Sequence, residues 1–166
     1  MRAYELFEDT KAGTTVKNWR NRDAAEYAEK LIKVFGEPDE ITSVCLSWRN
    51  IEFFSETVVK DESVPHDFPK PHRDFVYSTI HIEVPEELVG VLAEVTGSII
   101  IDGLKHEVTG RCGSLWANAV TLGFVQDLVD GKVSKDSVKA KKEYGKRILS
   151  GKKSALPDWY ENKVSD

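Results

Sequence analysis

Two apolar runs around Asp102-Gly103 limit the architecture more than any other part of the chain. Residues 98–102 and 104–109 are rich in β-branched side chains. Asp-Gly between such runs is a preferred two-residue turn, because glycine tolerates a positive φ. A similar pair of runs, 41–48 and 51–60, is separated by Arg49-Asn50. Short turns join antiparallel strands, so the sequence argues against a Rossmann or flavodoxin topology.

Helix signals lie between and after these strands. Asp23 is the expected N-cap of the clearest helix, with Glu26 at the third position and Gly36 as its stop. Residues 13–22 before it are expected to be a polar connection. The remaining expected elements are strands at 3–8 and 75–84, a helix capped by Ser114 and a last helix capped by Ser134. A short apolar element that starts at Pro85 and ends at Gly97 is expected to be a helix, with a strand as the alternative because it is rich in valine.

This order predicts an α+β fold in which a largely antiparallel sheet is covered by helices on one face. The length of 166 residues suits a single domain, which we expect over residues 1–151, followed by a loosely held tail over 152–166. No apolar run reaches the roughly 18 to 20 residues of a membrane span, and the first residues lack an apolar signal core. The expected location is therefore cytoplasmic, and in that reducing compartment Cys45 and Cys112 are expected to be unbridged.

The stretch 61–84 is the first candidate for a functional site, because it holds three of the four histidines and three of the six prolines. Its prolines predict a rigid, non-helical loop over 64–72, which feeds an alternating strand. Mixed imidazole and carboxylate groups suit zinc, manganese or iron. The candidate metal ligands are His66, His72, Asp67 and Asp74. The alternative is that these are solvated turn residues without a cofactor, and His81 is expected to be a buried, satisfied histidine.

The glycine-flanked segment before the helix at 115 is the second candidate. Backbone amides at a helix start, together with Arg111, could hold an anion, and the helix dipole would lower the pKa of the Cys112 thiol. The candidate anion-binding residues are Arg111, Cys112 and Ser114. The alternative is a glycine turn with an incidental thiol, because the segment lacks a Walker pattern.

Charge is distributed unevenly along the chain. The net charge is −5, yet residues 132–153 carry nine basic and two acidic residues, so this segment is +7 and the remainder is −12. Such asymmetry is consistent with a basic patch for an acidic partner, with self-association, or with a solvated helix. The candidate partner-binding residues are Lys139, Lys142, Lys146, Arg147 and Trp159.

The opening MRAYELFED, the small size and the lysine-rich end resemble the small accessory proteins of tailed bacteriophages. The resemblance implies an accessory role, as a virion component or as a binder of a host or phage protein, in the host cytoplasm or the virion. It covers no catalytic motif, so it assigns no functional residue.

Three functions are consistent with these patterns. The first is a non-enzymatic binding or assembly protein that acts through protein contacts or self-association. The second is a metal-dependent hydrolase centred on His66 and His72, in which an acid would act as base on a metal-bound water. The third is a nucleic-acid-associated protein that uses residues 132–153 and binds with a strong salt dependence.

Overall fold

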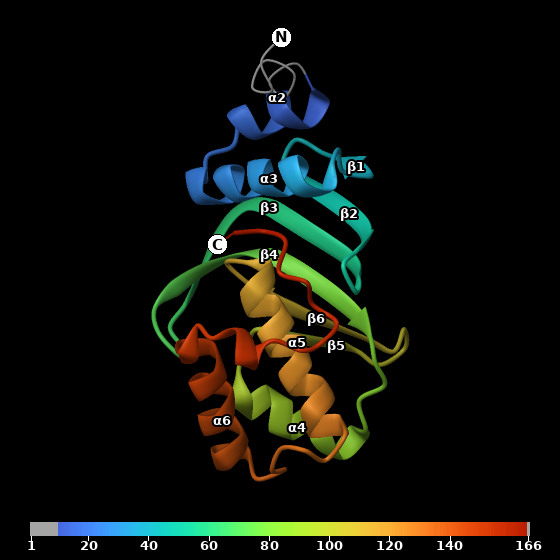
Figure 1. Ribbon diagram of the computed structural model, residues 1–166, viewed down its shortest axis with the longest axis vertical. Helices are drawn as coiled ribbons and strands as arrows, with labels where there is room; N and C mark the ends of the chain where they lie inside the picture. The colour runs from blue at the N-terminus through green and yellow to red at the C-terminus, as the bar shows by residue number, and fades with distance from the viewer. Residues whose placement is uncertain (1–9, 166) are drawn as a thin grey trace.

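A six-stranded antiparallel sheet of order β1-β2-β3-β4-β6-β5 forms the centre of the computed structural model, which describes residues 10–165 (Figure 1). The predicted α+β class with an antiparallel sheet is therefore confirmed. The strand expected at 3–8 lies outside the described residues. The strands are β1 (Glu40–Ile41), β2 (Cys45–Ile51), β3 (Phe54–His66), β4 (His72–His81), β5 (Ile99–Asp102) and β6 (Glu107–Cys112).

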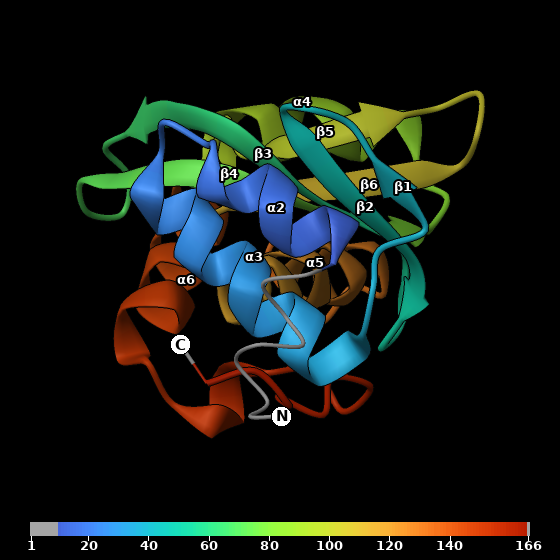
Figure 2. The same ribbon diagram turned by 90° about the horizontal axis from the view of Figure 1, so that it is seen from above.

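Helices cover one face of this sheet, as the view from above shows (Figure 2). Trp48, on the inner face of β2, donates from Nε1 to the Gly36 carbonyl at the end of α3, at 2.9 Å. Tyr27 of α3 accepts at its hydroxyl from the Leu115 amide at 2.7 Å, which ties α3 to the start of α5. The helices are α2 (Lys11–Lys17), α3 (Arg22–Phe35), α4 (Glu86–Val95), α5 (Leu115–Val129), α6 (Ser137–Ser150) and the 3₁₀ turn η1 (Lys153–Ala155).

Three local expectations for the helices are wrong in detail. Half of the expected polar connection at 13–22 belongs to α2, because Ala12 and Val16 bury a small apolar face that is easily missed in a polar segment. The cap of α3 is Asn21 rather than Asp23. Similarly, Asp136 rather than Ser134 caps α6, by accepting from the Lys139 amide at 2.9 Å. Among the described residues, no helix is long and apolar enough to span a membrane.

The turn between β5 and β6 is longer than the expected Asp-Gly turn. The strands pair at Asp102↔Glu107, which leaves four residues, 103–106, in the turn. The Asp102 carboxylate accepts from the amides of Leu104 and Lys105 at 3.1 and 3.0 Å, and His106 takes the positive φ of 53°. The side-chain cap of Asp102 thus replaces the glycine conformation that the sequence predicted.

The hairpin of β3 and β4 reaches into the expected proline loop. β3 ends at His66 and β4 begins at His72, so that only 67–71 form the turn. A β-bulge interrupts the pairing: the register passes from Val59↔Val76 to Val64↔Asp74, so β3 advances five residues while β4 advances two. Because side chains alternate along a strand, this odd difference changes which residues of β3 face the helices.

The C-terminal tail packs against the body of the domain and is not loosely held. Trp159 stacks on Phe53 with ring centroids 5.0 Å apart, and its Nε1 donates to Gln126 at 2.6 Å. Tyr160 and Val164 are 6% and 1% exposed. The expected loose tail is therefore held in place by these spaced apolar side chains.

Candidate metal centre

Two histidines and an aspartate meet where the β3–β4 hairpin leaves its turn. His66 is the last residue of β3 and pairs directly with His72, the first residue of β4. Asp74 lies two residues further along β4 and therefore on the same face as His72. The hairpin register thus brings together three of the four predicted metal ligands.

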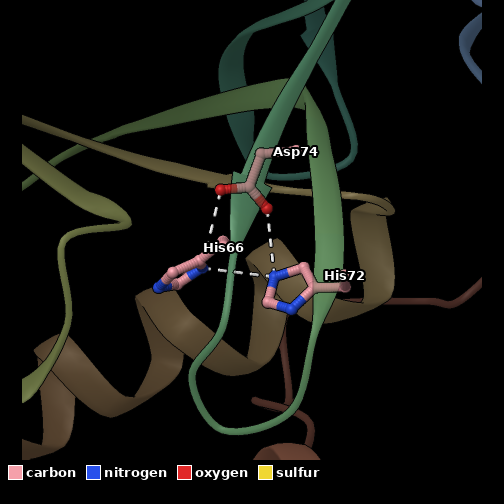
Figure 3. A group of neighbouring side chains, drawn as sticks. All are labelled: His66, His72 and Asp74. Carbon is pink, nitrogen blue, oxygen red and sulfur yellow. Dashed lines mark hydrogen bonds and ion pairs between the residues drawn. The ribbon is translucent and has the colours of Figure 1, made fainter.

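The ligand atoms of this triad, His66, His72 and Asp74, converge on one point (Figure 3). His66 Nδ1 lies 3.2 Å from His72 Nε2 and 3.6 Å from Asp74 Oδ2. His72 Nε2 lies 3.0 Å from Asp74 Oδ1. In a tetrahedral zinc site with bonds of about 2.0 to 2.1 Å, neighbouring ligand atoms are roughly 3.3 Å apart. The two histidine nitrogens therefore have the spacing of two corners of such a site, and each of them has one Asp74 oxygen at a similar distance.

The outer nitrogen of each imidazole ring has a hydrogen-bond partner that orients the ring. His72 Nδ1 lies 2.7 Å from the Lys70 carbonyl, which can only accept, so Nδ1 carries a proton. His66 Nε2 lies 3.4 Å from the Thr96 hydroxyl. Histidine ligands usually donate their second N–H to such a group, which directs the other lone pair toward the metal. Both rings are thus held in the orientation that a ligand needs.

Asp74 is fully buried and only partly satisfied. Its Oδ2 receives the Arg111 Nε at 3.3 Å, whereas Oδ1 accepts no hydrogen bond of good geometry although His72 Nε2 is close. With His72 neutral and protonated at Nδ1, this oxygen faces a nitrogen lone pair. A buried carboxylate oxygen in that position requires a positive charge, which is either an added proton on His72 or a bound cation.

The surroundings of His66 favour the neutral form of its ring, which is the form that binds a metal ion. Burial lowers the pKa of His66 below its ordinary value of 6.5, and the charge of Asp74 opposes this shift. The Ser98 hydroxyl lies 2.8 Å from His66 Nδ1. A hydroxyl can donate to a neutral imidazole, so His66 keeps an available lone pair near neutral pH.

The arrangement does not fit a nucleophile–histidine–acid triad. In such a triad one ring nitrogen contacts the nucleophile and the other contacts the acid. Here the Cys112 Sγ, at 3.5 Å, and Asp74 both approach the same Nε2 of His72. Likewise, Ser98 and Asp74 both approach Nδ1 of His66. Convergence on one nitrogen is the geometry of ligands around a shared ion.

The other predicted site residues lie in different surroundings. Asp67 is exposed in the hairpin turn and is outside the triad. Ser114 caps α5 by accepting from the Ala117 amide at 3.2 Å, and the Leu115 amide is taken by Tyr27, so the helix start offers little to an anion. Arg111 instead contacts Asp74, and Cys112 contacts His72. The three predicted anion-binding residues therefore have other contacts in this structure.

The predicted partner-binding residues divide into two groups. Arg147 pairs with Asp127 at 2.7 Å and with Glu143 at 3.1 Å, and Trp159 is half-buried in the tail. The exposed members are Lys139, Lys142 and Lys146. A cavity of about 800 Å³ borders this region, lined by α5, α6 and the tail rather than by the triad.

Sequence reasoning missed the surroundings of the triad. Cys112, Arg111 and Ser98 come from β6 and the start of β5, and only the register of β4 with β6 brings them close. His81 was expected to be buried, but its side chain is 67% exposed on the opposite face of β4, where it lies 3.6 Å from Glu107.

No family model, curated protein or solved structure matches this chain.

Proposed function

We propose that this protein binds one divalent transition-metal ion through His66, His72 and Asp74, with zinc as the best fit. The observation that carries the proposal is the buried Asp74 Oδ1, which accepts no hydrogen bond and lies 3.0 Å from a histidine nitrogen. A cation between these two atoms would turn an unfavourable contact into two bonds. Imidazole and carboxylate together suit zinc better than magnesium or calcium, which prefer oxygen ligands.

The ion would serve first as a cross-link within the sheet. His66 is on β3, and His72 and Asp74 are on β4, so a shared ion would link the two strands beside the hairpin turn. The turn also carries Phe68, which stacks on Tyr144 of α6 with ring centroids 6.0 Å apart. Metal binding would thus hold the hairpin turn against the last helix.

The test is metal content and zinc affinity, measured by elemental analysis and by calorimetry after removal of metal with a chelator. We expect one zinc per chain in the wild-type protein and no measurable binding in His72→Ala. His81→Ala is the matched control, because His81 lies on the same strand but points away from the triad. Equal zinc binding by His72→Ala and wild type would reject the proposal.

Self-association through α6 is a second candidate function. Val138 and Leu149 are 77% and 55% exposed, and they share a helix face with Lys142. Exposed apolar side chains among lysines suit a protein surface with acidic character. The rest of the chain has a charge of −12, so a second copy offers such a surface.

Sedimentation velocity at low and high salt tests this second candidate. We expect the wild type to sediment as an oligomer at low salt and to dissociate at high salt, and Leu149→Glu to remain monomeric. Leu104→Glu is the control, because Leu104 is 96% exposed on the distant β5–β6 turn. A wild-type monomer under all conditions would exclude self-association.

A further inference from the structure

We infer that the Cys112 thiolate is the fourth ligand of the proposed metal site, which makes the site a closed His₂AspCys centre. This inference rests on the proposed metal binding at His66, His72 and Asp74. Cys112 is the last residue of β6 and pairs with Val76 of β4. Asp74 and Val76 share the inner face of β4, so the register directs Cys112 to the face of the triad.

The distance from the sulfur atom to the triad agrees with coordination. The Cys112 Sγ lies 3.5 Å from His72 Nε2, the nitrogen that also faces Asp74. With a zinc–sulfur bond of about 2.3 Å and a zinc–nitrogen bond of about 2.0 Å, the two ligand atoms of a tetrahedral site are roughly 3.5 Å apart. Cys112 Sγ therefore lies at ligand spacing from His72. The ligand atoms already grouped within 4.8 Å of one another are those of His66, His72 and Asp74, so metal binding would draw the sulfur toward them.

The balance of charge requires an anionic fourth ligand. A divalent ion and Arg111 together bring three positive charges to a site where Asp74 supplies one negative charge. Buried charges are costly unless they are compensated. Metal binding deprotonates a coordinating thiol, so the Cys112 proton leaves to solvent as the metal–sulfur bond forms. The thiolate then offsets part of the excess positive charge.

Ser98 is the competing residue for the fourth position. Its Oγ lies 2.8 Å from His66 Nδ1, and it is 1% exposed. A neutral hydroxyl is not among the usual protein ligands of zinc, which are thiolate, imidazole and carboxylate. The Ser98 hydroxyl instead donates to the lone pair of His66 when no metal is bound, and it keeps that ring in place for the ion.

A fourth protein ligand would decide between the structural and hydrolytic roles. Catalytic zinc sites keep a position for water, whereas structural sites have four protein ligands. With Cys112 bound, the ion joins β3, β4 and β6 and has no position for an activated water. A thiolate ligand also favours zinc over magnesium and calcium, because those two ions prefer oxygen ligands. The expected role is therefore structural.

Cobalt(II) spectroscopy on the full chain tests this inference. Cobalt replaces zinc in tetrahedral sites and absorbs in the visible, and a thiolate ligand adds a charge-transfer band in the near ultraviolet. We expect both features in the wild type and in Cys45→Ser, since Cys45 lies on β2 beside Thr42 and away from the triad. In Cys112→Ser the charge-transfer band should fall to the baseline while visible absorption remains.

The outcomes separate the two proposals. Visible bands without a charge-transfer band in the wild type would overturn Cys112 as a ligand and leave the metal site intact. No cobalt bands and no cobalt binding in any variant would overturn the metal site itself. If Cys112→Ser does not fold, the spectra of wild type and Cys45→Ser still decide, because the chain has only two cysteines.

Discussion

The two faces of β4 hold their polar residues in different ways. On the outer face, polar side chains lie near solvent and have partners: the Tyr77 hydroxyl donates to Glu62, and Thr79 bonds Thr109 at 2.7 Å. On the inner face, which the helices cover, Asp74 is buried and His72 is partly buried, and one Asp74 oxygen accepts no hydrogen bond. The polar side chains named on the outer face are thus paired with each other, whereas the buried Asp74 oxygen on the inner face has no hydrogen-bond donor.

Whether buried polar atoms have partners is a better guide to a candidate site than the positions of polar residues alone. Histidines and acids occur on both faces, since His81 lies 3.6 Å from Glu107 on the outer side. Exposed pairs of that kind contribute little to stability, because water competes for both partners. The buried group combines short distances between candidate ligand atoms with an unsatisfied carboxylate oxygen, which is why we propose a bound cation there.

The largest expected effect is that of zinc on the stability of the wild-type protein. A ligand at a thousandfold excess over its Kd stabilises the folded state by about 4 kcal/mol. For a domain of this size the corresponding rise in Tm is roughly 8 to 16 °C. Differential scanning calorimetry with zinc and with chelator should show this rise in the wild type and in His81→Ala, but not in Asp74→Asn. An equal rise in Asp74→Asn would remove the distinction between the faces.

A smaller effect is expected from matched substitutions of hydrogen-bonding residues on the two sides of the sheet. Asn118 of α5 is fully buried against the inner face and donates to the Val76 carbonyl at 3.2 Å and to Ser78 at 3.0 Å. Asn118→Ala should cost about 2 to 3 kcal/mol, from two lost bonds and a cavity. Thr109→Val on the outer face should cost less than about 0.5 kcal/mol.

Urea unfolding in the presence of chelator measures both substitutions without a contribution from metal. The midpoint should move clearly for Asn118→Ala and barely for Thr109→Val, at an unchanged slope. Similar shifts for the two variants would mean that the outer face is as sensitive as the inner one.

The smallest effect concerns Tyr77 and is confined to alkaline pH. Burial raises the pKa of Tyr77 from 10.0 to about 12, with a further contribution from the hydrogen bond to Glu62. The unfolded chain therefore loses this proton first. The stability contributed by Tyr77 should be complete below about pH 10 and should be lost as the pH rises through about 12.

The tyrosinate absorbance of wild type minus that of Tyr77→Phe isolates this group from the other tyrosines. A midpoint near 12 is expected while the protein remains folded. A midpoint near 10 would show that Tyr77 has no protected partner and that the outer face is less well satisfied than its contacts indicate.

Much of the fold could be predicted from local sequence. The helix from Ser114 follows from its cap, and Gly151 ends α6 in the left-handed conformation, with φ of 58°. The hairpin of β2 and β3 follows from two alternating runs, but its turn is Glu52-Phe53 rather than the expected Arg49-Asn50, because β2 extends to Ile51. These features depend on neighbours in the chain, so composition and spacing are sufficient to find them.

The candidate site was predictable only in part. His66, His72 and Asp74 lie within nine residues, and their ligand chemistry alone suggested a metal. Cys112 and Ser98 could not be added, because their proximity depends on pairing between strands that are distant in sequence. Asp67 is as close to the two histidines in sequence as Asp74 is, but Asp67 lies in the β3–β4 turn, whereas Asp74 lies on the helix-covered face of β4.

The bulge in β3 makes the number of residues in 60–63 as important as their identity. β3 passes five residues there against two of β4, and this odd difference turns His66 inward. Consider an insertion or deletion of one residue that kept the pairing of His66 with His72. The side chains of β3 on one side of that change would then move to the opposite face of the sheet. An insertion of two would leave them on the same face. Descendants of this sequence should therefore tolerate length changes in this segment only in even steps, a parity constraint that no single substitution would reveal.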